Sequence, residues 1–463
     1  MVTSSNASAN DKALQINLDP SKYGTFAEIG AGQETANNFF YAGASAGTIA
    51  KTISAYDMTM SDAIYGRTTR YVSRGRLKHM LDHEYEILIR RLAAKRGENT
   101  SFFSYANTVR ARGYKDTGEC HGWMGIRLQL RPNGPPNDIV LHVRLLDPTN
   151  VQQQDALGVV GVNLIHAALY FDGDLDAFVK SLFDSLTIER IEIDMLKFEG
   201  ADFSGIDNRL CSLLLVQHGL AQAAMFSSEG EVLQPAECFY KRPLVVLRGD
   251  FQPPSVVHMD MLEQSCKQMR NDVDEDRKDK IVEITEITMH NLLREGNVDH
   301  RDFISRADML QALGKNVLIS KFAEFHRLAG YLSRYTNQPI GVLLGLPLFE
   351  KLFDEQWYEG LDGGILEGFG RLFKHRVKLH VYPTKTEEDT RVRKISDVRV
   401  PQHLKHLFLH ILNNGFVVEL ESDVEDALHI TPSDIRRMIL SGGDEWTNYV
   451  PEILPDRLMC SLE

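Results

Sequence analysis

The feature that most constrains the fold is an alternation of short apolar runs and helical patterns between residues 137 and 383. The runs are four to eight residues long and rich in β-branched side chains, as in buried strands. They begin at Ile139, Ile191, Ala223, Leu244, Ile281, Asn316, Ile340 and Val377. The clearest helical patterns between them cover 152–170, 208–220, 301–313 and 322–334. This alternation predicts βαβ units and a largely parallel sheet.

The number of runs favours a barrel-like (β/α)8 core over an open doubly wound sheet, although both suit this length. The PNGPP turn at 132–136 and the charged stretch at 384–394 predict the edges of that core. We therefore expect four segments, which are a flexible tail (1–22), a Gly-rich and helical region (23–136), the parallel α/β core (137–383), and a linker with a helical C-terminal region (384–463).

Composition and charge indicate a globular cytoplasmic protein. Among 463 residues, 43% are hydrophobic and 25% are charged, and the net charge of −13 opposes nucleic acid as the main partner. The N-terminus is polar, and no window approaches the ~18–20 apolar residues of a membrane span. The five cysteines show no CxxC spacing, which predicts unpaired thiols. We expect no membrane partner, and the oligomeric state stays open.

Polar side chains within the apolar runs are the first candidates for a site. Glu192 and Asp194 alternate with apolar residues, and so do His142 and Arg144 in an earlier run. Further candidates are Glu283, which lies within a run, and Arg248 and Lys321, which follow or end one. Because the carboxyl ends of parallel strands line one crevice, we expect Glu192, Asp194, Glu283 and Lys321 to share a pocket. Each residue could instead be solvent-facing or paired internally.

Such a pocket suits a small anionic, phosphorylated metabolite. Glu192, Asp194 and Glu283 would supply acid/base chemistry, with Lys321 and His142 as further catalytic candidates. Arg144 and Arg248 would bind the anion. Glu192 and Asp194 would alternatively hold a divalent cation, because carboxylate oxygens are its preferred ligands.

A glycine turn gives a second interpretation. Gly30 and Gly32 follow a short apolar stretch in AEIGAGQ, like the turn of nucleotide and S-adenosylmethionine sites, where backbone amides approach a phosphate. The third glycine of the dinucleotide fingerprint is absent, so a structural turn is the alternative. Arg70 and Arg74 belong to a basic cluster that could bind an anion, and His121 is a candidate ligand-binding residue.

The chain resembles a bacterial family of proteins of about this length. The resemblance rests on AEIGAGQE (27–34), KTISAYDM (51–58), HGWMGIR (121–127), RIEID (190–194) and LDGGILEGFGRLF (361–373), in this order. Members carry two incompatible labels, TonB-dependent receptor and nicotinate-nucleotide adenylyltransferase. The sequence supports neither label, because it has no export signal and no HxGH motif. No catalytic residue can be transferred from the resemblance.

Three functions therefore compete. The first is a cytoplasmic enzyme that binds a small anionic metabolite at the carboxyl ends of the core strands. The second is a nucleotide- or S-adenosylmethionine-binding transferase that uses Gly30 and Gly32. The third is a non-catalytic assembly or regulatory protein.

Overall fold

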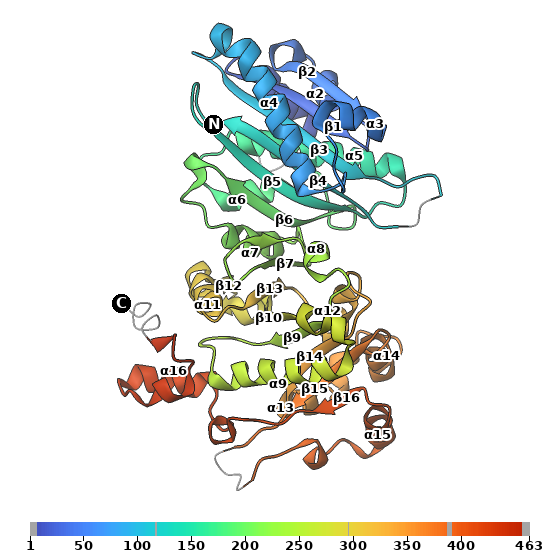
Figure 1. Cartoon of the computed structure of the whole chain (residues 1–463), viewed down its shortest axis with the longest axis vertical. Coiled ribbons are helices and arrows are strands. Elements are labelled where there is room, and N and C mark those ends of the chain that lie inside the picture. Colours follow the sequence, from blue (N-terminus) through green and yellow to red (C-terminus); the bar gives the residue numbers. More distant parts are fainter. Residues whose placement is uncertain (1–6, 116–117, 295, 387–390, 456–463) are drawn as a thin grey trace. The chain divides into compact units, whose positions relative to one another are not determined.

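The computed structural model describes residues 7–115, 118–294, 296–386 and 391–455 (Figure 1). The chain divides into two compact units, Met1–Ala224 and Met225–Glu463. Within the described residues, no helix is long and apolar enough to cross a membrane. Cys120, Cys211, Cys238 and Cys266 are unpaired, and Cys460 lies outside the described residues.

The first unit is built on a six-stranded mixed sheet, here called sheet A, with the order β2-β1-β3-β4-β5-β6. Its strands are β1 (Lys22–Ile29), β2 (Ile49–Ala55), β3 (Ser101–Arg110), β4 (Cys120–Gln129), β5 (Pro136–Leu145) and β6 (Ile191–Glu199). Strand β1 runs parallel to β2 and β3. The pairs β3–β4, β4–β5 and β5–β6 are antiparallel.

Helices cover both faces of sheet A (Figure 1). They are α1 (Ala9–Asn17), α2 (Glu34–Ala42), α3 (Met58–Tyr65), α4 (Arg74–Arg96), α5 (Asn150–Leu169), α6 (Leu175–Ser181) and α7 (Asn208–Gln217). Ser104 Oγ donates to Leu81 O of α4, whereas the next residue, Tyr105, contacts Thr35 of α2. Because successive strand residues point to opposite faces, α4 and α2 lie on opposite sides of the sheet.

The second unit contains an eight-stranded sheet, here called sheet B, with the order β16-β15-β14-β9-β10-β13-β7-β8. Its strands are β7 (Ala223–Phe226), β8 (Val232–Leu233), β9 (Leu244–Arg248), β10 (Val282–Thr288), β13 (Asn316–Ser320), β14 (Ile340–Gly345), β15 (Val377–Tyr382) and β16 (Val417–Glu419). The pairs from β16 to β9, and from β9 through β10 to β13, are parallel. Strand β8 pairs antiparallel with β7.

The described part of the second unit also contains nine α-helices, several short 3-10 helices and a small hairpin. The helices are α8 (Pro235–Phe239), α9 (Val256–Asp272), α10 (Met289–Leu292), α11 (His300–Ala312), α12 (Phe325–Leu332), α13 (Leu346–Lys351), α14 (Gly364–Leu372), α15 (Lys405–Asn413) and α16 (Pro432–Ser441). Strands β11 (Leu293–Arg294) and β12 (Asn297–Val298) form the hairpin. Met309 of α11 packs with Ile435 of α16 and with Trp446, so the C-terminal segment has its own apolar contact with the core.

The eight predicted runs are all strands, but they do not form one sheet. The runs from Ile139 and Ile191 are β5 and β6 of sheet A, where they pair antiparallel. The others belong to sheet B, whose order has two ends and no pairing between them among the described strands. Sheet B is therefore open, and the expected barrel is not observed.

The predicted segment edges also differ from the structure. The PNGPP turn joins β4 to β5 within one hairpin, because turn residues mark a hairpin as readily as a linker. In the C-terminal region, β16 pairs with β15 and so belongs to sheet B. The region 23–136 contains four strands that the pattern of apolar runs does not predict.

The expected tail is wrong for residues 9–17, which form α1. Its Ala13 and Ile16 are fully buried. The Lys12 ammonium forms an ion pair with Asp184 at 2.7 Å and a hydrogen bond with Asn163 at 2.8 Å. This stretch is polar overall, but its few apolar residues lie on one face of α1 and pack against the unit. Residues 1–6 lie outside the described residues.

We predict that Ile16→Ala destabilises the first unit by about 2–4 kcal/mol, because it leaves a cavity under α1. The matched control is Leu18→Ala, at a position that is 66% exposed and should change the free energy of unfolding by less than about 0.5 kcal/mol. Urea denaturation of both variants checks this. Equal effects would contradict the buried position of α1.

Candidate functional site

The connections of sheet B predict where a ligand would bind. From β9 the chain adds β10 and then β13 on one side, and it then returns to add β14 on the other side of β9. In open parallel sheets, ligands bind beyond the carboxyl ends of the strands at such a reversal. In sheet B this reversal lies between the carboxyl end of β9, at Arg248, and the carboxyl end of β14, at Gly345.

A cavity of about 150 Å³ lies at this position. Arg248 lines it from the end of β9, and Ala323 to His326 line it from the segment after β13. The helices after β14 and the short helical turn Glu355–Tyr358 supply the remaining wall. That part of the lining consists of Leu348, Lys351, Leu352, Trp357, Tyr358, Gly368 and Leu372. The wall is therefore mostly apolar, with a few nitrogen-bearing side chains.

A buried ion pair holds the carboxyl edge of sheet B together. Glu286 of β10 is fully buried and accepts from Arg248 Nε at 2.8 Å and Nη2 at 3.1 Å. Ser320 Oγ at the end of β13 donates to the same carboxylate at 2.6 Å. Arg248 Nη1 also donates to Ala323 O at 2.7 Å, and its guanidinium lies 4.4 Å from the centre of the Phe325 ring. The pair thus links three strands to one cavity wall.

Arg248 was expected to bind an anion, but in the structure it forms an ion pair with Glu286. Three of the five N–H groups of its guanidinium are used within the protein, so two can still donate to a ligand. Its first role in the structure is to position the wall of the cavity.

Two other nitrogen groups of the cavity lack protein partners among the described residues. Lys351, at the end of α13, is exposed and forms no ion pair. His326 is 8% exposed, and its Nε2 is buried without a hydrogen-bond partner. Burial lowers the pKa of His326. Since buried polar atoms are normally hydrogen-bonded, this nitrogen is an unsatisfied polar group of a residue that lines the cavity.

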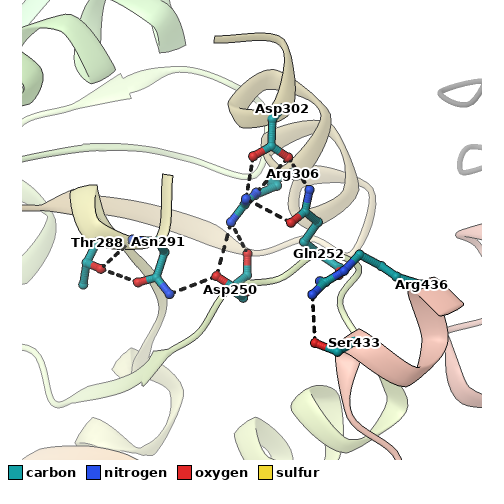
Figure 2. Close-up of polar contacts among 8 residues, drawn as sticks. All are labelled: Asp250, Gln252, Thr288, Asn291, Asp302, Arg306, Ser433 and Arg436. Atoms are coloured by element: carbon teal, nitrogen blue, oxygen red, sulfur yellow. Dashed lines mark hydrogen bonds and ion pairs between the residues drawn. The ribbon is translucent and has the colours of Figure 1, made fainter. Parts of the chain in front are cut away.

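A second polar network fixes the loop after β9 (Figure 2). Arg306 of α11 is fully buried and donates to Asp250 O at 2.9 Å, to Gln252 Oε1 at 3.1 Å and to Asp302 Oδ1 at 3.1 Å. Asn291 Nδ2 donates to Asp250 Oδ1 at 2.9 Å, and Arg436 of α16 donates to Gln252 O. These groups satisfy one another, so we assign the network a structural role.

The expected shared pocket of Glu192, Asp194, Glu283 and Lys321 is wrong. Glu192 and Asp194 lie on β6 of sheet A, in the first unit. Glu283 lies near the amino end of β10, where it accepts from Lys315 at 2.6 Å. Lys321 follows the carboxyl end of β13 and is exposed. Because β10 and β13 are parallel, Glu283 and Lys321 lie at opposite ends of sheet B.

The remaining strand candidates do come together, at one end of sheet A. His121, His142 and Asp194 form a hydrogen-bonded chain. Beside it, Arg144 donates to Glu192 at 2.5 Å and to Glu119 at 2.7 Å. Within the described part of the chain, no group of three or more His, Cys, Asp or Glu side chains is arranged to hold a metal ion.

The two candidate arginines of the basic cluster, Arg70 and Arg74, make separate contacts in the first unit. Arg74 forms an ion pair with Glu199 of β6 at 2.7 Å. Arg70 lies in the turn before α4, where Ser73 Oγ donates to its carbonyl.

The glycine turn has the expected strand–turn–helix form. The backbone amides at the start of the helix, however, bind a side chain of the protein itself. Gly30 and Gly32 adopt φ of 93° and 74° between β1 and α2, a conformation that favours glycine. The carboxylate of Glu28 accepts from Thr35 N at 3.4 Å and Ala36 N at 2.9 Å, and from Asn107 Nδ2 at 3.0 Å. A residue of the chain therefore takes the position that a phosphate would occupy at these two amides.

No protein-family model and no curated protein matches the chain, and three solved structures show distant likenesses to part of it. A competence/damage-inducible protein, CihA, from Agrobacterium tumefaciens is 16% identical, with 36% of this chain and 97% of that chain covered at a TM-score of 0.25. One from Enterobacter asburiae is 14% identical, with 35% and 99% covered at 0.26. A CinA-superfamily protein from Enterobacter cloacae is 13% identical, with 36% and 96% covered at 0.26. Likenesses at this level carry no argument about function.

We predict that Arg248→Met lowers the free energy of unfolding of the second unit by about 3–5 kcal/mol, because it leaves Glu286 buried without its cation. Adding Glu286→Leu should recover most of this loss. The control Lys351→Met, at an exposed position, should cost less than about 0.5 kcal/mol. Urea denaturation followed by hydrogen exchange in β9 and β10 measures these effects. A double variant as unstable as Arg248→Met would contradict the pairing.

We also predict a pH dependence that originates at Glu28. Burial raises its pKa to about 7, above the ordinary value of 4.5. The folded chain therefore keeps a proton that the unfolded chain has lost, and the stability of the first unit falls as the pH rises through this window. The fall should approach roughly 3 kcal/mol, since one pKa unit corresponds to about 1.4 kcal/mol. The Glu28→Gln side chain cannot ionise, so this variant should not show the fall in stability. Urea denaturation at pH 5 and pH 8 measures it: the free energy of unfolding should fall between the two pH values in the wild type and not in Glu28→Gln.

Proposed function

We propose that the second unit binds a small organic anion in the cavity at the carboxyl edge of sheet B, as part of a cytoplasmic enzyme that acts on a small metabolite. The observation that carries the proposal is an apolar cavity lined by Lys351, whose exposed ammonium has no ion pair among the described residues, and by His326, whose buried Nε2 has no hydrogen-bond partner there.

The size of the cavity supports an aromatic or short aliphatic group. An apolar cavity of about 150 Å³ holds a group of the size of benzene. Trp357 and Leu348 are 57% and 37% exposed, so part of the apolar wall is open to solvent before a ligand binds. Covering such a wall is favourable by about 25 cal/mol per Å² of apolar surface.

The charges around the cavity support a negatively charged ligand. Arg248 is paired with Glu286, and Glu324 forms an ion pair with Arg327 at 3.1 Å. The ammonium of Lys351 is then the one charge of the lining without a counterion among the described residues. An anionic carboxylate or phosphate beside Lys351 would neutralise it, and the two remaining N–H groups of Arg248 could donate to the same oxygens.

The alternatives receive less support from the geometry. A nucleotide at the glycine turn would have to displace the Glu28 carboxylate from the amides of Thr35 and Ala36. A purely structural role would leave Nε2 of His326 buried without a partner among the described residues.

The proposal predicts that phenyl phosphate binds the full chain more tightly than inorganic phosphate or benzyl alcohol does, because only phenyl phosphate has both the ring and the anion. Fluorescence of Trp357, which lines the cavity, should change on titration, and Trp357→Phe should remove that change. Lys351→Met should weaken binding about tenfold, the equivalent of about 1.4 kcal/mol.

The matched control is Lys405→Met, which removes an exposed lysine outside the cavity lining and should leave the affinity unchanged. Equal affinity for phenyl phosphate and inorganic phosphate, or equal losses in the two lysine variants, would contradict the proposal.

A further inference from the structure

A second group of chemically active side chains lies in the first unit, on three neighbouring antiparallel strands. His121 is on β4, His142 on β5 and Asp194 on β6, at the end of sheet A where β4 and β6 begin and β5 ends. Parallel strands β1 and β3 also end here, as their register with one another and with β4 requires. The group is thus at the carboxyl edge of the parallel part of the sheet.

A β-bulge brings Asp194 into this group. His142 pairs with Met195 and Val143 pairs with Ile193, so Asp194 is the extra residue on β6. Bulges redirect a side chain and occur often beside active sites. Here the bulge lets the carboxylate reach His142 on the next strand, with Asp194 Oδ1 2.6 Å from His142 Nδ1.

We assign the protons of this group with Asp194 ionised and His142 neutral. An ionised carboxylate only accepts, so Nδ1 of His142 carries a proton and donates to Asp194. In the neutral ring, Nε2 of His142 is then an acceptor, and Nδ1 of His121 donates to it at 3.0 Å. Nε2 of His121 is left unprotonated, and it has no hydrogen-bond partner among the described residues.

The inner members of this hydrogen-bonded series, Asp194 and His142, are more deeply buried than His121 at its outer end. Asp194 and His142 are each 1% exposed, and the Trp123 and His142 rings pack in a T-shaped arrangement with 4.9 Å between ring centres. His121 is only half-buried. Burial is the main cause that lowers the pKa of His121 to about 4, so its ring is neutral at physiological pH.

The charges around His121 determine the charge of a group that can bind next to it. The cations are Arg110 and Arg144, and the carboxylates are Glu119, Glu192 and Asp194. The carboxylates outnumber the cations, so this end of the sheet disfavours an anion and accepts a neutral group or a positive charge.

We infer that His121 is a general base that takes a proton from water or from the hydroxyl of a neutral substrate, with His142 and Asp194 as its positioning residues. The O–H bond breaks, its electron pair stays on oxygen, and the proton joins Nε2 of His121. The proton on Nδ1 of His121 can then pass to Nε2 of His142, which places the positive charge beside Asp194. This inference concerns the first unit alone and does not depend on the cavity of the second.

The first test is acylation of histidines in the full chain by diethylpyrocarbonate, which reacts with unprotonated ring nitrogens and is read by mass spectrometry. His79 is exposed, lies in the same unit and serves as the internal control for access of the reagent. Between pH 8 and pH 5, the rate at a short unstructured histidine peptide should fall about 30-fold, for the ordinary histidine pKa of about 6.5. The rate at His121 should change less than twofold. No reaction at His121, or a fall equal to that of the peptide, would overturn the inference.

The second test separates positioning from packing, by ¹⁵N NMR of the protein labelled at histidine. The wild type should show His121 with a proton on Nδ1 and none on Nε2. His142→Phe removes the acceptor and Asp194→Asn removes the charge that orients it, so each should lower the population of this tautomer at least twofold. Trp123→Phe alters the packing of His142 but keeps the hydrogen-bonded chain, so it should leave the tautomer unchanged. If Trp123→Phe shifts the tautomer as much as the other two variants, the relay is overturned. An unshifted tautomer in a folded Asp194→Asn protein overturns it as well.

Discussion

The ion pair between Arg248 and Glu286 is the contact on which the carboxyl edge of sheet B depends. A carboxylate buried within a sheet is costly unless a cation and further hydrogen bonds satisfy it, and here the neighbouring strand and Ser320 provide both. The same guanidinium reaches Ala323 O and the face of Phe325, so the pair also orders the segment that forms one wall of the cavity. Arg248 therefore satisfies a buried carboxylate and also helps to shape the cavity.

Local structure could be predicted because its signals lie within a few residues of one another. Every apolar run from Ile139 to Val377 is a strand, since its length and composition suit one. The pairing of these strands could not be predicted, because β5 and β6 are joined by helices as parallel strands would be and yet lie antiparallel. The strands β1 and β3 were missed because they contain buried polar residues, such as Ser104 and Asn107, which weaken the apolar pattern.

The candidate sites were also predictable only where the signal lies within one strand. Alternation along each strand placed His142 with Arg144 and Glu192 with Asp194, and neighbouring strands do unite these pairs. The role of His121 depends on a diagonal contact between strands, which no pattern in the sequence indicates. Lys351 and His326 were missed because they lie on helices after β14 and β13. The usable signal was their position directly after strands of a parallel sheet, where ligand-binding residues concentrate.

A crystal structure of the full chain with phenyl phosphate tests the ligand site most directly. The ring should lie against Trp357 and Leu348, with a phosphate oxygen within hydrogen-bond distance of the Lys351 ammonium. Phenyl phosphate bound elsewhere on the chain, with this cavity empty at saturating concentration, would contradict the assignment of the carboxyl edge of sheet B as the binding site.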